Sequence, residues 1–317
     1  MATLWFPCFF AAGFALLGLF AFAHPTPHDL RVGVFAPATA SDFTGLPQGI
    51  DLIEVHDSAL AGSLVASGEL AAATDGSVLY LASAASSTRF GYLEDTFAQH
   101  AADRLTSIDV NPLAPGDASG VGLFFYALPN LLVGLVTSIA LLQAGPWPIA
   151  KKALAILGTG LFSAVFTFVL ATALHAIPAD PRLIGYALLL TQAIGWLTTA
   201  AALYVKRYFM PLAMTFVLII GIPSSGGTVN ADMLPYWVRW MGEWHPFAQF
   251  IEAARAQAYL GSSVARPLAV VLAWAALGGA LLVIRSRLER RAAAPATPTS
   301  RTETRIPATE GEHHVRT

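Results

Sequence analysis

Six apolar runs, separated by polar segments, constrain this sequence more than any other feature. About 20 consecutive apolar residues are enough for a helix to cross the hydrocarbon of a bilayer. The composition agrees, because 55% of the 317 residues are hydrophobic and only 12% are charged, about half the charged fraction of a soluble domain. The sequence therefore predicts an α-helical integral membrane protein with six transmembrane helices, over residues 4–23, 120–143, 153–176, 183–205, 208–222 and 267–284.

The first run has two interpretations. Ala21, Phe22 and Ala23, placed before His24, look like the small-x-small cleavage site of a secretory signal peptide. The run is long for such a peptide, however, and no basic residue precedes it. We therefore expect residues 1–23 to form an uncleaved transmembrane helix, a signal anchor. A cleaved signal peptide is the alternative, and five spans would then keep the same orientation.

Residues 24–118 differ from the rest of the chain in charge and in pattern. They contain 12 acidic residues and 3 arginines, for a net charge of −9. Short apolar runs alternate with segments of helical pattern, which is typical of a small α/β domain. We expect strands over 31–38, 50–57, 70–75 and 77–83, a candidate fifth strand over 107–112, and helices over 58–68 and 88–105.

The basic residues outside this acidic region predict an orientation. They follow the second, fourth and sixth runs, so the six-span count places all three clusters on one side: Lys151 and Lys152; Lys206 and Arg207; Arg285, Arg287, Arg290 and Arg291. Basic loops face the cytoplasm. We therefore expect a multi-pass protein of the plasma (cytoplasmic) membrane with both termini cytoplasmic, an extracytoplasmic α/β domain over 24–118, a five-helix domain over 119–285, and a disordered tail over 286–317.

The segment between the last two runs, residues 221–263, carries the most distinctive local pattern. It opens with Pro223 and a Ser-Ser-Gly-Gly turn, which cannot continue a helix. Aromatic residues then recur three or four positions apart, as they do along one side of a helix at a membrane interface. We expect short helices over 223–263 that lie in the outer interface or re-enter the membrane there, and a long aromatic loop is the alternative. The aromatic residues are Trp237, Trp240, Trp244, Phe247 and Phe250.

Several function classes lack their usual residues. No Asp, Glu, Lys or Arg falls inside a predicted span between 120 and 222, whereas proton- and sodium-coupled carriers need ionisable groups there. The polar residues in these spans are instead expected to bond between helices. None of the eight histidines forms a HExxH pattern, and the sequence has neither a GxSxG nucleophile motif nor a GxxxxGK[ST] loop. We expect no enzymatic activity, no cofactor, no metal site and no nucleic-acid partner.

Ten residues in and near the Gly-x-Pro-Ser-Ser-Gly-Gly turn of residues 221–227 carry a family resemblance. They are Gly221, Pro223, Ser224, Ser225, Gly226, Gly227, Leu234, Pro235, Pro246 and Arg255. With them the segment resembles the outer segment of the YhgE/Pip (phage infection protein) group of type-2 ABC permease-like membrane proteins, and the plan of one span, an outer domain and five spans is also similar. The resemblance implies a permease-like fold that works as a homodimer or hetero-oligomer, with outer helices shaping an exit.

Permeases of this type contact a separate ATPase through a cytoplasmic loop. Here only residues 1–3 precede the first span, so no amphipathic helix is expected before it. The loop over 143–152 is the sole candidate coupling element, with Trp147 placed between two prolines. The coupling residues we expect are Pro146, Trp147, Pro148, Lys151 and Lys152.

Two functional hypotheses follow. In the first, the chain is the membrane-embedded subunit of an export system that moves a lipid, drug or envelope component, and a separate ATP-binding cassette subunit supplies the energy. In the second, it is a non-transporting receptor or scaffold whose outer domain binds a surface, phage or secretion partner. For the outer segment, the expected site residues are those of the family pattern except Leu234, together with Trp240 and Trp244.

Overall fold

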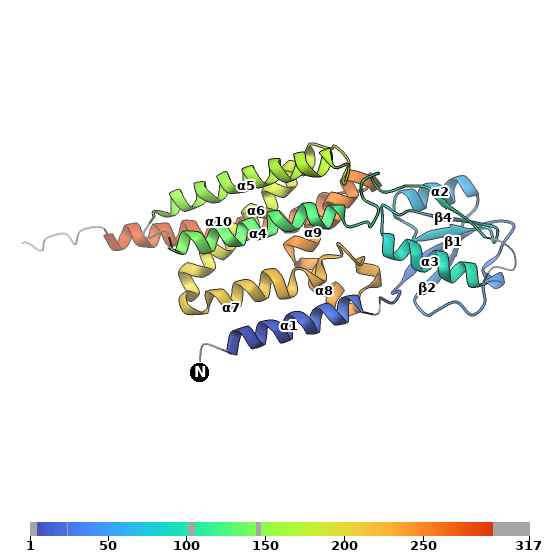
Figure 1. Ribbon diagram of the computed structural model, residues 1–317, viewed down its shortest axis with the longest axis horizontal. Helices are drawn as coiled ribbons and strands as arrows, with labels where there is room; N and C mark the ends of the chain where they lie inside the picture. The colour runs from blue at the N-terminus through green and yellow to red at the C-terminus, as the bar shows by residue number, and fades with distance from the viewer. Residues whose placement is uncertain (1–4, 24, 101–104, 144–146, 294–317) are drawn as a thin grey trace, which may run out of the picture.

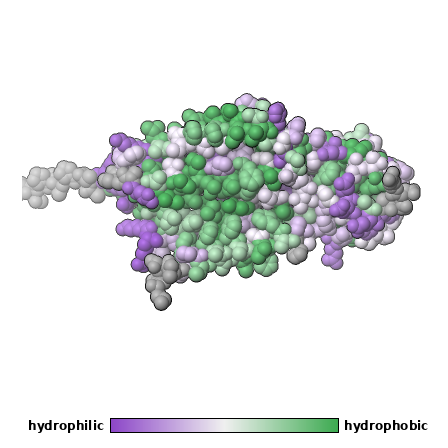
Figure 2. All heavy atoms as spheres, in the orientation of Figure 1, coloured by the Kyte–Doolittle hydropathy of each residue, from purple (hydrophilic) through white to green (hydrophobic). Residues whose placement is uncertain are grey.

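The chain folds into a helical part and a sheet part that lie end to end (Figure 1). The computed structural model describes residues 5–23, 25–100, 105–143 and 147–293. The helical part has an apolar surface, and hydrophilic residues gather over the sheet part and at the opposite end (Figure 2). This distribution is compatible with helices that lie in a membrane.

Five helices of the described chain are long and apolar enough to cross a membrane. Four of them coincide with predicted spans: α1 (Trp5–Phe22), α4 (Gly122–Gln143), α5 (Ile149–Ala173) and α10 (Ala265–Ala293). The remaining one covers Arg182–Ile220 and includes two of the predicted spans. The structure thus describes five candidate spans where the sequence predicts six.

The difference arises at Lys206, where the backbone leaves the helical region. Lys206 ends α6 (Arg182–Val205) with φ 49° and ψ −109°, and a 3-10 turn, η2 (Lys206–Tyr208), follows. The chain then reverses into α7 (Phe209–Met214) and the π-helix η3 (Thr215–Ile220), which run beside α1 (Figure 1). These two short helices are together only roughly 18 Å long, too short to cross hydrocarbon alone.

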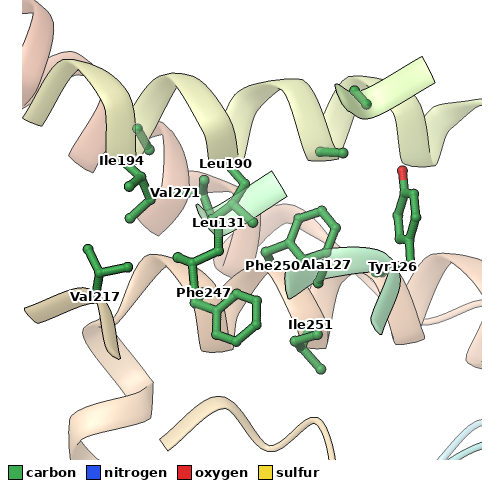
Figure 3. Packing of buried hydrophobic residues seen from close by; sticks show 14 of the residues in the cluster. Tyr126, Ala127, Leu131, Leu190, Ile194, Val217, Phe247, Phe250, Ile251 and Val271 are labelled. Atoms are coloured by element: carbon green, nitrogen blue, oxygen red, sulfur yellow. The ribbon is translucent and has the colours of Figure 1, made fainter. Parts of the chain in front are cut away.

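Helices α4, α5, α6 and α10 pack around one apolar core (Figure 3). Glycine allows the closest approach, because a Cβ at Gly134 would lie 3.0 Å from the carbonyl oxygen of Thr191 on α6. Neutral polar groups then bond between helices, as predicted. Ser138 bonds to Thr198 and Thr199, at 2.7 and 2.9 Å.

The sheet part contains five strands between two helical layers. The strand order is β2 (Ile50–Glu54), β1 (Leu30–Val34), β3 (Ala72–Thr74), β4 (Val78–Leu81) and β5 (Thr106–Asp109), and only β3 and β4 pair antiparallel. Helix α2 (Ser58–Ala66) packs on one face and α3 (Ser87–His100) on the other. These strands and helices lie where the sequence predicts them, the fifth strand included.

The helix starts and the sheet turns have local causes in the sequence. Asp57 accepts the backbone N–H of Leu60 at 2.7 Å and so caps α2. Asp75 accepts the backbone N–H of Ser77 and of Val78, which fixes the turn between β3 and β4.

The ends of the helical part differ in what they carry. The starts of α1 and α5, the turn η2 and the end of α10 all lie at the end away from the sheet (Figure 1). The three basic clusters therefore share one end. Helix α10 continues to Ala293, with Arg285 donating to Glu289 at 2.9 Å, so it passes residue 286, where the disordered tail was predicted to begin. The rest of that predicted tail, 294–317, lies outside the described residues.

Candidate functional site

The segment over 221–263 is a series of short helices that connects the two parts of the molecule. Its elements are η4 (Pro223–Ser225), η5 (Ala231–Met233), α8 (Tyr236–Trp244), α9 (Pro246–Arg255) and the π-helix η6 (Ala256–Leu260). Its first half packs into the core of the sheet part through Val229, Met233 and Val238. Its second half packs into the core of the helical part. The segment therefore consists of short helices, as the sequence predicts, and is not the long aromatic loop of the alternative interpretation.

The Gly-x-Pro-Ser-Ser-Gly-Gly turn is stabilised by hydrogen bonds from its own serine side chains. Ser224 donates to the carbonyl oxygen of Ile220 at 2.7 Å, and Ser225 donates to that of Ile222 at 2.8 Å. Both serines are therefore buried with their hydroxyls satisfied. Gly226 takes φ 66°, a conformation that favours glycine. A Cβ on Gly227 would lie 2.6 Å from the ring of Phe124.

Gly221 and His245 explain the π-helix before this turn. The carbonyl oxygen of Phe216 accepts the backbone N–H of Gly221 at 3.2 Å, and Nε2 of the His245 ring also lies 3.0 Å from this oxygen. The other ring nitrogen of His245 accepts the backbone N–H of Phe247 and caps α9. Gly221 makes room for this ring, because a Cβ there would lie 2.7 Å from His245 Cε1. The sequence analysis did not identify His245 as part of this site.

The aromatic residues divide between two helices instead of sharing one side of a helix. The chain breaks between Trp244 and Pro246, where His245 takes an extended conformation. Trp240 is 52% exposed, whereas Phe247 and Phe250 are fully buried in the bundle core beside α4 (Figure 3). Prolines begin both helices: Pro235 is the N-cap of α8, and Pro246 is the first residue of α9.

Trp237 and Trp244 place α8 between α1 and α10. The ring of Trp237 meets that of Phe20 on α1 with centroids 6.0 Å apart. The ring of Trp244 lies against Phe216 and Trp274, each at 6.3 Å, and its carbonyl oxygen accepts the indole N–H of Trp274 at 2.7 Å. The exposed rings of α8 thus belong to the side of the molecule that α1 occupies.

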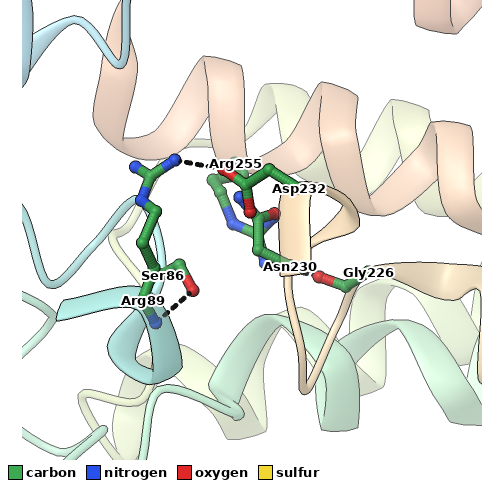
Figure 4. Close-up of polar contacts among 6 residues, drawn as sticks. All are labelled: Ser86, Arg89, Gly226, Asn230, Asp232 and Arg255. Atoms are coloured by element: carbon green, nitrogen blue, oxygen red, sulfur yellow. Dashed lines mark hydrogen bonds and ion pairs between the residues drawn. The ribbon is translucent and has the colours of Figure 1, made fainter. Parts of the chain in front are cut away.

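Two arginines tie the segment together and hold the sheet part against it (Figure 4). Arg89 on α3 donates to the carboxylate of Asp232 at 2.6 Å, and its side chain is only 8% exposed. Arg255 on α9 donates to Asn230 at 2.9 Å and to the carbonyl oxygen of Gly226 at 3.0 Å.

These groups surround a polar cavity of about 550 Å³ between the sheet part, α8 and α9, which we name the junction cavity. Its charged lining is balanced between four arginines and four carboxylates: Arg89, Arg239, Arg255, Arg266, Glu69, Asp232, Glu243 and Glu252. The turn residues Ser224, Ser225 and Gly226 also line it. The cavity therefore suits a polar, overall neutral ligand better than a strongly charged one.

The candidate coupling residues lie at the opposite end of the helical part (Figure 1). Trp147 is 45% exposed, and Pro148 is the N-cap of α5. Lys151 is exposed but Lys152 is buried, so the two lysines do not form one basic surface. Pro146 lies outside the described residues. The structure does not bring the two predicted sites together.

The ion pair and the hydrogen bonds of the junction use three residues that were not predicted as site residues: Arg89, Asn230 and Asp232. Arg89 is one of only three arginines among twelve carboxylates in 24–118, and that isolation was the available signal. Its partner is 143 positions away, which no local pattern reveals. Across the described residues, no group of three or more His, Cys, Asp or Glu side chains could hold a metal ion.

In comparisons with known proteins, no family model, no curated protein and no solved structure matches the chain.

Proposed function

We propose that the chain is the membrane-embedded, permease-like subunit of an export system for a lipid, drug or envelope component. One observation carries the proposal: helices α8 and α9, placed between the last two helices, fold back into the bundle and bury Phe247 and Phe250 in its core. A break at His245 and Pro246 lets this pair close the bundle at the sheet end. Helices in that position are what the resemblance to YhgE/Pip proteins implies for an exit.

In this proposal the chain crosses the plasma membrane six times. Helix α7 and η3 return toward the sheet end, and the re-entrant segment completes that crossing. The basic residues at the far end then face the cytoplasm, with both termini, and the sheet part is extracytoplasmic. Cysteine labelling tests this: in a Cys8→Ser background, Asp95→Cys should react with an impermeant maleimide on intact cells, and Arg207→Cys should not. The reverse result would contradict the orientation.

The energy for export would come from a separate ATP-binding cassette subunit, because the sequence has no phosphate-binding loop. The exposed ring of Trp147 offers the candidate contact. An ATPase should co-purify with the detergent-solubilised protein, and Trp147→Ala should remove most of it. Trp240→Ala, a change of an equally exposed tryptophan at the other end, is the matched control and should leave it bound. Preparations that never contain an ATPase would contradict export.

The junction cavity favours a second candidate function, a receptor or scaffold. A polar cavity of about 550 Å³ has the size of small-ligand sites, and the net charge of −9 over 24–118 gives the sheet part a surface for basic partners. In this alternative the spans anchor and dimerise the protein. A partner captured by the outer surface from cells that lack any associated ATPase would favour it over export.

A further inference from the structure

A second cavity lies on the outside of the helical part, between α4 and α5. It is an apolar groove of about 570 Å³, open along one side. We name it the α4–α5 groove. Its walls are Phe125, Pro129 and Val133 from α4, and Phe162, Phe166 and Leu170 from α5.

The groove follows from the sequence of α4. Pro129 lies inside this helix and has no backbone N–H for the carbonyl oxygen of Phe125. Such a residue is a usual cause of a kink in a helix, and Pro129 lies in the wall of the groove. Below the groove, Asn130 bonds to Ser163 at 2.8 Å and to Thr167 at 3.0 Å. The polar side chains of Asn130, Ser163 and Thr167 thus satisfy one another's hydrogen bonds, so a molecule in the groove needs no polar group to bond to them.

The surface around the groove indicates what medium it faces. Three of its phenylalanines point outward, with Phe125 61%, Phe162 70% and Phe166 55% exposed. They continue the apolar surface of the helical part, the side that lies in hydrocarbon if these helices span a membrane. The groove is therefore open to lipid chains rather than to water.

The dimensions favour an acyl chain over a helix of another protein. Packed helices have axes about 8–10 Å apart, whereas a helix with its side chains is about 10–12 Å wide, so another helix could lie over the groove but could not fill it as a narrower acyl chain can. The wall from Val121 to Val133 is roughly 18 Å long. One acyl chain spans half of the hydrocarbon, roughly 15 Å.

We propose that the α4–α5 groove binds one acyl chain of a lipid from the leaflet on the sheet side. The groove lies along the half of α4 that is nearer the sheet part. The loop over 116–119 lines the end of the groove that is nearest the sheet part. The lipid headgroup then lies beside this loop, at the level where the sheet part begins. The inference rests on the membrane placement in the proposed function, and neither export nor an ATPase enters it.

Photo-crosslinking tests the proposal on the full-length protein. The protein is reconstituted into vesicles of phosphatidylethanolamine and phosphatidylglycerol that contain a phospholipid with a diazirine in its acyl chain. After illumination, mass spectrometry locates the labelled peptides. We expect the label to concentrate on residues 121–133 and 162–174 and to exceed that on the exposed face of α10 by about tenfold, as for one specific site.

Matched tryptophan substitutions fill the groove or leave it open. Val133→Trp should lower the groove label by about tenfold, because the indole takes the space of the chain. Val136→Trp, on the same helix at a 58% exposed position outside the groove, should leave it unchanged. The same test can be made on α5, where Leu170→Trp fills the groove and Val169→Trp is the control outside it. This second pair decides whether the groove binds the chain if Val133→Trp does not fold.

Three outcomes would overturn the proposal. An even label over every apolar helix would indicate ordinary contact with lipid and no site. Equal label in the filled and control variants would place the chain elsewhere. Absence of label on the groove residues, while the other apolar helices are labelled, would show that a second copy or another helix covers the groove. A failure of the membrane placement is recognised separately, because no helix would then be labelled.

Discussion

The junction and the bundle interior are both buried and polar, yet they use different chemistry. The junction relies on charge, with Arg89 paired to Asp232 and Arg255 held by an amide and a carbonyl oxygen. The interior between α4, α5 and α6 relies on hydroxyl and amide groups such as Asn130 and Ser138. Charges are tolerated where water or a partner is near, whereas neutral groups are cheaper to bury in hydrocarbon. In the membrane placement proposed above, the boundary between these chemistries marks where the hydrocarbon ends.

The largest effect should come from removing one charge at the junction. Asp232→Ala leaves the Arg89 guanidinium buried without its partner, and we expect a loss of about 3 kcal/mol in the free energy of unfolding. Thermal unfolding in detergent measures it. The double change Arg89→Met with Asp232→Leu should recover most of the loss. Glu289→Ala breaks the exposed pair with Arg285 and should change stability by less than about 0.5 kcal/mol. Equal losses of stability at the Arg89–Asp232 and Arg285–Glu289 pairs would contradict the view that the junction depends on its buried charges.

Glycines test the tight contacts at the boundary. Gly221→Ala puts a methyl group against the carbonyl oxygen of Val217 and the His245 ring, so we expect a loss of about 2 kcal/mol in the free energy of unfolding. Gly158→Ala meets nothing within 4 Å and should stabilise α5 by about 0.5 kcal/mol, since alanine is the better helix former. Denaturation in mixed micelles compares the two. A neutral Gly221→Ala would show that η3 and His245 can move apart.

The tryptophans of α8 separate packing from exposure. Trp244→Ser removes contacts with Phe216 and Trp274 and should lower stability by about 1.5 kcal/mol. Trp240→Ser, at an exposed position, should change it by less than about 0.5 kcal/mol. Protease protection should find both variants inserted, because the apolar runs are unchanged. Failure of either variant to insert would show that α8 is needed to place the spans.

The sequence predicted the elements whose cause is local. Apolar length located α1, α4, α5 and α10, and alternating patterns located the strands of the sheet part. The turn at Gly226 was likewise evident, because Pro, Ser and Gly determine the backbone there. Local patterns could not show that α7 and η3 are too short to cross alone, since an apolar run gives no warning of a π-helix.

The site was predictable only in part, because its residues meet across the chain. The break at His245 depends on a hydrogen bond to Phe216, 29 positions earlier, so the aromatic spacing wrongly predicted one continuous helix face. In the same way, Lys151 and Lys152 are neighbours in sequence and yet differ in burial. Periodicity predicts which side a residue faces, but the neighbouring helix decides what that side meets.

The smallest effect should come from the neutral network inside the bundle, and it tests the comparison most directly. Asn130→Leu removes the hydrogen bonds to the side chains of Ser163 and Thr167. Both hydroxyls can still donate to carbonyl oxygens of their own helix, because the Thr167 hydroxyl already donates to the backbone carbonyl oxygen of Ser163 at 2.8 Å. We therefore expect a loss of only about 1 kcal/mol. Thr137→Val, at an exposed pair with Thr159, is the control and should be neutral in the same thermal unfolding assay. A loss as large as that of Asp232→Ala would mean that the interior depends on Asn130 as strongly as the junction depends on charge.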